Sequence, residues 1–453
     1  MSDRIEAALA RGLDTKVVVM GEDVLGRTGP AVASLFPGQR AVLVADENTW
    51  GVAGEAVRAS LEASGIGLDE PIIYPGSPVL FADDKAVEDL RSRLAATDAV
   101  AVSIASGSLN DITKLASHRV GRSYLNVCTA ASVDGYTSFG AAIVVDGVKG
   151  TQECPAPRGI VVPLDVMAAA PARMTATGYG DLIEKVPAGA DWIIADELGV
   201  EPIDDEVWGL VQGPLRGALA DPAGLAAGQI GAVTQLAEGL VLSGLAMQLF
   251  SSSRPASGGG HYFSHQWEME GYGRDWNPPL SHGFKVGLGT VAMCALYEKV
   301  LDLDLTRFDI EARLRNWPTL AADEARVRAL QPNPVICEAA VAQSAAKYLA
   351  PDQARTRLET IRDHWNTIRT RVSAQVLPAA VVEQMLRTVG AIHHPAQIGV
   401  SLGQLRTKYL QAQTIRTRYT VLDLLEEVGL LETLVDELFA PGGYWYERGE
   451  NAN

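Results

Sequence analysis

The chain has little cysteine, little histidine and few basic residues for its length, and each shortage narrows the classes of protein to which it can belong. Its 453 residues include four cysteines, none spaced as a CxxC pair, so we expect reduced thiols in a cytoplasmic protein. Lysine and arginine number 38 against 55 acidic residues, which gives a net charge of −17. Nucleic acids and anionic membranes require basic surfaces, so neither is an expected partner.

Long apolar runs are also lacking. The longest, at 239–250, is shorter than the ~20 residues that cross a bilayer, so we expect a buried helix and no membrane insertion. A chain of 453 residues exceeds what one hydrophobic core usually serves, which predicts at least two domains. Closed two-fold assemblies are the commonest oligomers, and we therefore expect a homodimer.

The first third of the chain alternates short apolar runs with helical patterns. The apolar runs predict buried strands at 17–20, 41–46, 71–75, 99–105 and 124–130. Helices are expected between them at 22–36, where Gly29-Pro30 should interrupt the helix, and at 52–65, 83–97 and 109–120. This order predicts a parallel sheet with helices on both faces. Residues 141–151 predict a hairpin that turns at Asp146-Gly147.

Beyond Pro163 the pattern becomes helical. The expected helices lie at 165–170, 181–197, 223–251, 284–302, 321–330, 335–349, 353–374, 378–389 and 402–438. We therefore predict an α/β domain over residues 1–164 and an all-α domain over residues 165–453.

Three stretches of the first domain place polar residues where predicted strands end. ASGSLNDITK (105–114) opens a helix, whose N-terminus attracts an anion such as a pyrophosphate; a turn capped by Ser108 or Asn110 is the alternative. Asp46 could accept a hydrogen bond from a ribose hydroxyl and repel a 2′-phosphate, or it could simply start a turn. CTAASVDGYTS (128–138) follows a third strand, as ligand-binding loops do, although polar loops are common.

Three of the seven histidines, His261, His265 and His282, cluster in the second domain. In a helix, His261 and His265 would share one face as in HExxH, but Tyr262 replaces the glutamate of that motif. Imidazoles together with a carboxylate suit zinc or a related divalent ion. Asp181, expected at a helix N-terminus after a glycine turn, could act as an N-cap or complete an Asp/His/His site with an open fourth position.

The chain resembles the iron-type alcohol dehydrogenase and glycerol dehydrogenase superfamily, and most of all its sn-glycerol-1-phosphate dehydrogenase branch. Five stretches carry the resemblance, in family order: SGSLNDITK, CTAASVDGYTS, GYGDLIEK with GADW, SRPASGGGHYFSH and HGFKVG. The resemblance is firm over residues 40–290 and weak beyond residue 330. It implies a dehydroquinate synthase-like fold, in which a nucleotide-binding α/β domain and a helical domain flank a cleft. Ala105 and Ser106 stand where relatives commonly have glycine, and Gly260 where relatives of this branch often have an acid.

The resemblance also implies roles for single residues. Asp181, His261 and His282 match the metal ligands, with zinc the expected metal and nickel or iron the alternatives. His265 matches a histidine near the substrate and nicotinamide, and Asp134 an aspartate that faces the substrate. The expected cofactor is NAD, with NADP as the alternative. The residues that match its binding positions are Asp46, Ser106, Gly107, Ser108, Asn110, Asp111, Thr129, Ser132 and Ser138.

The implied reaction interconverts dihydroxyacetone phosphate and sn-glycerol 1-phosphate, a step of phospholipid metabolism. We expect His265 to relay a proton and Asp134 to orient the neighbouring hydroxyl. Arg254 and Lys285 could bind the phosphate or form a surface basic pair. Three other functions fit the sequence: a dehydrogenase of free glycerol or another polyol, a lyase like 3-dehydroquinate synthase, which usually has glutamate in place of Asp181, and a non-catalytic NAD- or metabolite-binding protein.

Overall fold

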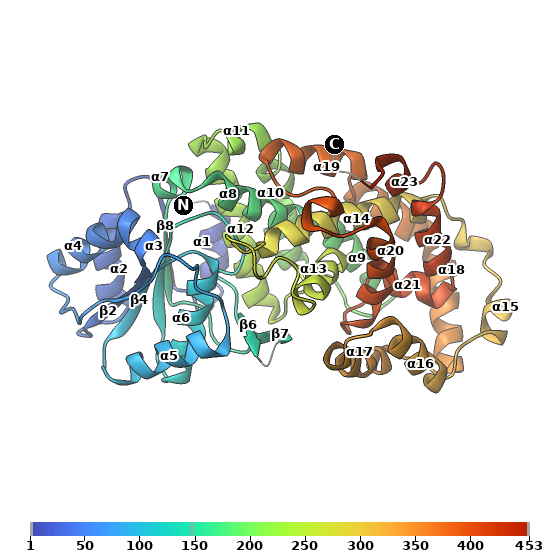
Figure 1. The fold of residues 1–453 in the computed structure, drawn as a ribbon, viewed down its shortest axis with the longest axis horizontal. Helices are drawn as coiled ribbons and strands as arrows, with labels where there is room; N and C mark the ends of the chain where they lie inside the picture. The colour runs from blue at the N-terminus through green and yellow to red at the C-terminus, as the bar shows by residue number, and fades with distance from the viewer. Residues whose placement is uncertain (1–2, 146–147, 451–453) are drawn as a thin grey trace.

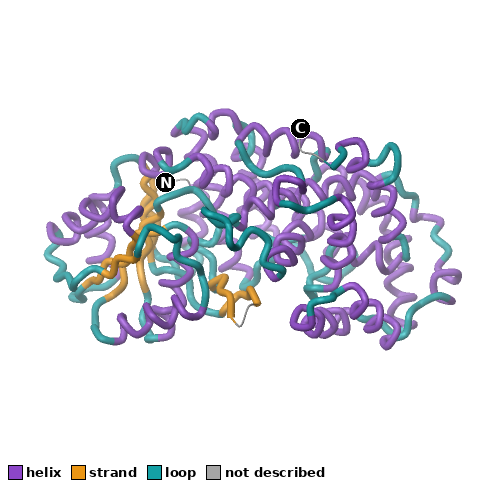
Figure 2. The backbone as a smooth tube through the Cα atoms, in the orientation of Figure 1, coloured by secondary structure: helices purple, strands orange, loops and turns teal. Residues whose placement is uncertain are grey.

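The computed structural model describes residues 3–145 and 148–450. A parallel sheet stands at one end of the molecule, and helices make up most of the remainder (Figures 1 and 2). The sheet has the order β1-β8-β5-β4-β2-β3. Its strands are β1 (Val17–Gly21), β2 (Ala41–Asp46), β3 (Ile72–Tyr74), β4 (Val100–Ala105), β5 (Tyr124–Cys128) and β8 (Gly159–Pro163). The predicted parallel sheet is confirmed, and β8 is a strand that the sequence did not predict.

Helices cover both faces of this sheet (Figure 1). Those of one face are α2 (Thr28–Leu35) and α4 (Glu55–Ala63), and those of the other are α5 (Asp84–Ala95) and α6 (Gly107–Arg119). Successive residues of β2 alternate between the two layers, since Val42 and Val44 pack with α5 and α6 whereas Leu43 and Ala45 pack with α2 and α4. Because both faces are buried, β2 is apolar up to its last residue.

The chain reverses its direction across the sheet between β2 and β4. It passes from β2 to the edge strand β3 through α4, and it then returns through α5 to β4, on the other side of β2. Right-handed crossovers in opposite directions place these two helices on opposite faces. In open α/β sheets, ligands bind at the carboxyl ends of the strands that flank such a reversal. The residues that follow β2 and β4 therefore lie where a nucleotide would be expected.

The structure corrects one local prediction and confirms another. Gly29 and Pro30 do not interrupt a helix, because they lie in the first turn of α2, where a proline removes no intrahelical hydrogen bond. The predicted hairpin is confirmed as the antiparallel pair β6 (Ala141–Val145) and β7 (Val148–Gln152). Its predicted turn, Asp146-Gly147, lies outside the described residues.

After β8 the described chain is helical, as predicted. Its helices are α7 (Leu164–Ala169), α8 (Ala172–Ile183), α9 (Lys185–Glu197), α10 (Asp205–Ala218), α11 (Pro222–Ala226), α12 (Ile230–Phe250), α13 (Gly259–Met269), α14 (His282–Leu301), α15 (Ile310–Arg315), α16 (Leu320–Leu330), α17 (Pro334–Lys347), α18 (Pro351–Gln375), α19 (Ala379–Val389), α20 (Leu402–Thr414), α21 (Val421–Val428), α22 (Leu431–Phe439) and α23 (Tyr444–Arg448). The sequence did not predict α10, α13, α15 or α23. The helix expected at 181–197 corresponds to the end of α8 and to α9, the one expected at 223–251 to α11 and α12, and the one expected at 402–438 to α20, α21 and α22. The largest buried apolar cluster includes Val18 and Ile160 of the sheet together with residues of this helical part, so the division at residue 164 stays a prediction.

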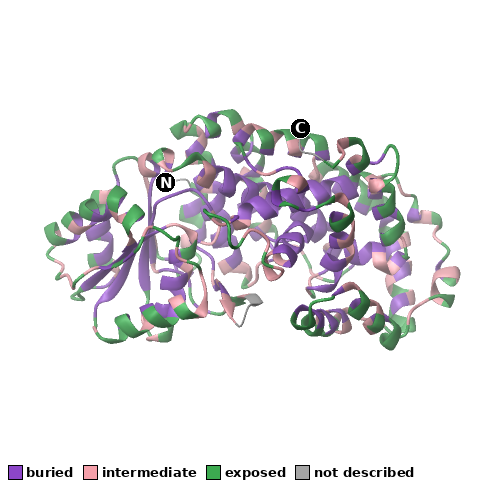
Figure 3. Ribbon diagram, in the orientation of Figure 1, coloured by how far each residue is buried: buried purple, intermediate pink, exposed green. Residues whose placement is uncertain are grey.

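Helix α12 is long and apolar enough to cross a bilayer by length and composition, with a mean hydropathy of 1.4. It lies within the helix expected at 223–251 and extends beyond both the apolar run at 239–250 and the ~20 residues that cross a bilayer. However, 72% of its most apolar window is buried inside the protein, as expected for a core helix. Figure 3 shows buried residues concentrated along the inner helices, whereas the outer helices are exposed on one side.

Helices α8, α13 and α14 approach one another at glycines. A Cβ atom on Gly180 would lie 2.4 Å from the carbonyl oxygen of Gly283, and a Cβ atom on Gly289 would lie 2.3 Å from that of Gly260. No side chain fits between backbones this close, so α14 contacts both α8 and α13 directly. These contacts bring the end of α8 together with the beginnings of α13 and α14.

We expect Gly180→Ala to lower the free energy of unfolding by about 1–3 kcal/mol, because an added methyl group would push α14 away. Gly209→Ala is the matched control, since Gly209 is an exposed position of α10 whose added Cβ would meet nothing within 4 Å. That control should be neutral or stabilise by up to ~1 kcal/mol. Denaturant unfolding measures both, and a Gly180→Ala protein as stable as the control would contradict the close crossing.

Candidate functional site

Asp181, His261 and His282 come together where α8, α13 and α14 meet. Each offers one ligand atom, and these atoms lie within 4.8 Å of one another. His261 Nε2 is 3.5 Å from Asp181 Oδ1. The side chains of Asp181 and His261 are almost fully buried, whereas that of His282 is 25% exposed. One carboxylate oxygen and two imidazole nitrogens in this arrangement could hold one divalent cation.

The sequence led us to expect Asp181 at the beginning of a helix, and this prediction is wrong. Asp181 lies near the end of α8, which starts at Ala172, and so it is not an N-cap. The glycines before it suggested a turn, but in the structure they are helical positions that a neighbouring backbone approaches. A Cβ atom on Gly178 would lie 2.0 Å from the carbonyl oxygen of Ala131. In this case close packing between two segments, not a turn, explains the glycines.

Two glutamates lie against the imidazoles of this trio. Glu184 Oε2 lies 2.9 Å from His261 Nδ1, and Glu268 Oε1 lies 2.9 Å from His282 Nδ1. The acids face Nδ1 of each ring and leave Nε2 for an ion, which is how metal-binding histidines are usually oriented. A Cβ atom on Gly260 would lie 2.8 Å from Glu184 Cγ, so Glu184 fills the space beside the position where relatives often have an acid.

Neither glutamate was predicted from the sequence. A signal for Glu184 was present, because it follows Asp181 by three residues and therefore lies one helical turn away. Glu268 follows His265 by three residues in α13 in the same way.

Lys185 connects the trio to the N-terminal part of the chain. Its buried ammonium group lies 3.2 Å from Asp181 Oδ1 and 2.7 Å from Asp134 Oδ2. Asp134 also accepts a hydrogen bond from Ser243 Oγ at 2.9 Å, and its backbone N–H donates to Asp181 Oδ2 at 3.1 Å. Asp134, which the resemblance places near the substrate, is thus in direct contact with one residue of the trio.

The charges around the trio favour a positive group within it. Burial opposes ionisation of Asp181, but Lys185 and then the two histidines keep the pKa of its carboxyl group well below the usual value. Burial also opposes a charge on His261, yet Glu184 and Asp181 raise the pKa of this imidazole to about 9. At neutral pH the metal-free protein therefore has a proton on His261, which a bound cation would replace.

His265 lies one turn after His261, and its ring centroid is 6.1 Å from those of both His261 and His282. Burial, and after it the charge of Arg416, lowers the pKa of His265 well below its usual value, so the ring is neutral. Nη2 and Nε of Arg416 lie 3.1 and 3.3 Å from His265 Nδ1. Because a guanidinium group can only donate, Nδ1 accepts and Nε2 carries the ring proton. Arg416 lies between α20 and α21 and was not predicted from the sequence as a site residue.

The predicted cofactor residues follow neighbouring strands. Asp46 ends β2, Ser106 follows β4 and Thr129 follows β5, so all three lie at the carboxyl edge of the sheet. Asp46 also starts a turn, as the alternative interpretation had it, because its Oδ1 accepts from the Thr49 backbone at 2.8 Å.

The first turn of α6 has no side-chain cap. Its N-cap residue, Ser106, makes no side-chain capping bond, and the suggestion that Ser108 or Asn110 caps the helix is wrong. Asn110 Oδ1 instead accepts from Tyr124 Oη at 2.8 Å, while Ser108 is exposed. Within the described residues, the backbone N–H groups of this turn therefore bond to no capping side chain, as anion binding at a helix N-terminus requires.

The other predicted cofactor residues lie in or beside the 128–138 loop. A Cβ atom on Gly107 would lie 3.3 Å from Val133, and Asp111 Oδ2 accepts from the Ala142 backbone at 3.3 Å. The hydroxyl groups of Ser132 and Ser138 bond within the loop, to Tyr136 Oη at 3.0 Å and Gly135 O at 3.2 Å. Whether these residues contact a cofactor stays a prediction.

Arg254 and Lys285 do not form a surface basic pair, because both are buried. Arg254 donates to the carbonyl oxygens of Asp191 and Tyr419 at 2.8 Å each, and its Nε lies 3.3 Å from Glu201 Oε2. Arg254 therefore joins segments of the helical part, and its guanidinium group is not available to a phosphate.

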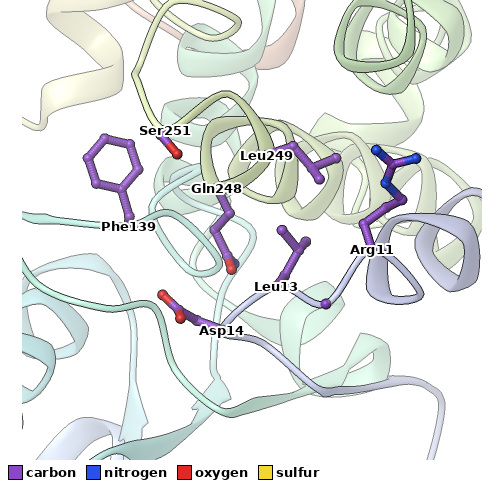
Figure 4. Close-up of a pocket in the computed structure, with 8 residues that line it drawn as sticks. Arg11, Leu13, Asp14, Phe139, Gln248, Leu249 and Ser251 are labelled. Carbon is purple, nitrogen blue, oxygen red and sulfur yellow. The ribbon is translucent and has the colours of Figure 1, made fainter.

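A hollow of about 440 Å³ lies between residues 11–14, Phe139 and the end of α12 (Figure 4). Gln248 points into it and donates to Thr15 Oγ1 at 2.9 Å. None of the predicted site residues lines this hollow, so it adds nothing to the site described above.

The chain is similar to known proteins over most of its length. A family model described as iron-containing alcohol dehydrogenase matches residues 19–171. A glycerol-1-phosphate dehydrogenase (NAD(P)+) of Halalkalibacterium halodurans is 34% identical over 300 residues, which are 65% of this chain and 75% of that protein. The corresponding enzyme of Geobacillus thermodenitrificans is 27% identical over 402 residues, 87% of this chain and 88% of that protein.

Among solved structures, glycerol dehydrogenase from Schizosaccharomyces pombe superposes with a TM-score of 0.58 at 15% identity, over 95% of this chain and 92% of that one. This likeness supports the fold, and the sequence relatives identify the family. The chain belongs to the iron-containing alcohol dehydrogenase family, in its glycerol-1-phosphate dehydrogenase branch.

Proposed function

We propose that the protein is a metal-dependent, NAD(P)-linked dehydrogenase that interconverts dihydroxyacetone phosphate and sn-glycerol 1-phosphate. The convergence of Asp181, His261 and His282 beside Asp134 carries this proposal. The relatives named glycerol-1-phosphate dehydrogenase support it. The three alternatives are not favoured. A lyase like 3-dehydroquinate synthase usually has glutamate at the position of Asp181, and a non-catalytic binding protein needs no metal-binding trio. Neither of the two sequence relatives named above is a dehydrogenase of free polyols.

The donor set fits a divalent cation. Asp181 would supply an oxygen, and His261 and His282 would each supply Nε2, because Glu184 and Glu268 face the other ring nitrogens. We propose zinc, with nickel or iron as alternatives. A cation bound there supplies Lewis-acid chemistry to the carbonyl or hydroxyl oxygen of the substrate.

Asp134 and His265 would serve the substrate around this centre. Lys185 and Ser243 fix the Asp134 carboxylate, which would orient the substrate hydroxyl next to the reacting carbon. Because Arg416 bonds to Nδ1 of His265, this ring can exchange a proton only through Nε2. We therefore propose that His265 acts by donating a hydrogen bond from Nε2 to the reacting oxygen of the substrate.

The nucleotide would lie at the carboxyl edge of the sheet. We propose that residues 1–164 bind the cofactor, with its pyrophosphate at the N-terminus of α6 and its adenosine ribose at Asp46, which favours NAD over NADP. Residues 165–453 would bind the metal and the substrate. The nicotinamide supplies the hydride. The remaining proposed contacts are Ser106, Gly107, Ser108, Asn110, Asp111, Thr129, Ser132 and Ser138.

We further propose a cytoplasmic homodimer that acts in phospholipid metabolism. All four cysteines are buried free thiols, which suits a reducing compartment. The net charge of −17 gives no support to a nucleic-acid partner.

Assays of NADH and NADPH oxidation with dihydroxyacetone phosphate and with free dihydroxyacetone, together with metal analysis, test the function. We expect turnover of the phosphorylated substrate to sn-glycerol 1-phosphate and one metal ion per chain. Preference for the free triose would instead indicate a polyol dehydrogenase. Nucleotide binding without metal or turnover would indicate a non-catalytic protein.

We expect His282→Ala to abolish tight metal binding and to lower turnover by at least about 100-fold, because one of only three protein ligands is lost. His364→Ala is the matched control, since this exposed histidine contacts only Glu197 among the bonds of the described chain. Metal content by mass spectrometry and steady-state rates measure both. Activity that persists in a metal-free His282→Ala preparation would contradict the ligand assignment.

Metal binding should depend on pH through His261, whose pKa of about 9 means that a proton must leave before the ion binds. Below that pH we expect the apparent affinity for zinc to fall by about tenfold for each pH unit, and to level off above it. Competition with a chelator between pH 6 and 8 measures this slope. Glu184→Gln should flatten it, because Glu184 is the main charge that raises the pKa of His261. A pH-independent affinity in the unchanged protein would refute the account.

A further inference from the structure

We propose that Arg416 binds the phosphate group of the substrate and so selects a phosphorylated triose over a free one. The inference rests on the proposed function, and it assigns a specificity-determining residue that neither the sequence motifs nor the trio identifies.

Among the residues that the structure describes, the half-buried cation Arg416 forms no ion pair with a carboxylate. In the described part of the chain, its hydrogen bonds are those to Nδ1 of His265, a neutral ring nitrogen. Glu268, an acid close enough for its charge to act on Arg416, faces His282 instead. A guanidinium group offers five donors, so several remain for a ligand. A partly buried positive charge without a counter-ion is costly, and a dianionic phosphate would offset that cost.

Four other basic side chains of the helical part bond to protein partners. Lys185 pairs with Asp134 and Asp181, and Arg254 bonds to carbonyl oxygens. Arg418 donates to Ser257 O at 2.9 Å and to Ser253 Oγ at 2.7 Å. Arg173 donates to Pro279 O at 2.8 Å and lies over the ring of Phe284. Of these cations, Arg416 is the one that contacts the histidine cluster itself.

Arg416 lies at a suitable distance from the trio. Its guanidinium group touches His265, whose ring is 6.1 Å from the rings of His261 and His282. In a triose phosphate, only one methylene group and one ester oxygen separate the carbonyl carbon from phosphorus. A substrate whose carbonyl oxygen lies at the trio would therefore hold its phosphate within reach of the neighbouring side chain. The planar fork of arginine suits bidentate contact with phosphate oxygens.

The segment directly after Arg416 is fixed by two hydrogen bonds. Tyr419 O accepts from Arg254 at 2.8 Å, and Arg418 O accepts from Tyr262 Oη at 2.9 Å. Tyr262 belongs to α13, the helix of His261 and His265, so the segment is tied to the site itself. A charge held in place before binding loses little entropy when the ligand arrives. Helices α20 and α21, which the sequence left without a role, position this segment.

Kinetics with two substrates test the proposal. In Arg416→Met we expect the KM for dihydroxyacetone phosphate to rise by about 10- to 100-fold, as for loss of charged hydrogen bonds. The KM for free dihydroxyacetone should stay within about twofold, since that substrate has no phosphate. Arg416→Lys should restore part of the lost affinity for dihydroxyacetone phosphate, because lysine keeps the positive charge but cannot make bidentate contact with the phosphate. Arg173→Met, which removes another arginine of the helical part, is the control and should affect both substrates equally or not at all.

Binding of inorganic phosphate to the metal-loaded protein, measured by calorimetry, gives a readout that needs no turnover. We expect the unchanged protein and Arg173→Met to bind phosphate, and Arg416→Met to bind it at least about tenfold more weakly. Unaltered phosphate binding in Arg416→Met would overturn the proposal. The proposal would also be overturned if Arg416→Met impaired turnover of both triose substrates equally and displaced the pH profile of the reaction. Arg416 would then act through His265 and not on the phosphate. If the unchanged protein binds phosphate through Arg416 but does not reduce dihydroxyacetone phosphate, the proposed function fails and the phosphate site stands.

Discussion

The candidate site depends on direct backbone contact between three helices. Gly180, Gly260 and Gly283 each stand next to a residue of the trio in the sequence, and each takes part in a contact that no Cβ atom would allow. Because α14 touches α8 and α13 without side chains between them, the residues beside these glycines are brought close enough to share an ion. Larger residues would separate the helices and with them the ligands, so the packing and the chemistry have a common cause.

Buried charges then tie the two parts of the chain to this centre. Lys185 lies between Asp134, from the loop after β5, and Asp181, from the helical part. The buried charges of Lys185 and Asp181 would be costly without their partners. Glu184 and Glu268 lie against Nδ1 of His261 and His282, on the side of each ring away from Nε2. The result is a centre in which acids outnumber fixed cations, and an added cation balances them.

The sequence could predict what depends on local pattern, and it could not predict what depends on contact between distant segments. Strand β2 was predicted to the residue because burial on both faces leaves an unbroken apolar run. Asp181 was assigned to the wrong end of a helix, because a glycine needed for close packing has the same appearance in a sequence as a glycine needed for a turn. Arg416 contacts His265 across 151 positions, and no spacing rule reaches that far. The histidine cluster and Asp181 suggested a metal site from the residues alone, and the order of the motifs in a known family selected Asp181, His261 and His282 as its ligands.

The central claim is that Asp181, His261 and His282 bind one metal ion. Crystals grown with zinc and measured at its absorption edge test this most directly, since anomalous scattering locates the ion without assumptions about ligands. The account predicts a single strong peak within bonding distance, about 2.0–2.2 Å, of one Asp181 oxygen and of Nε2 of both histidines. A peak at any other group of residues, or an ion that contacts fewer than two of the three, would contradict it.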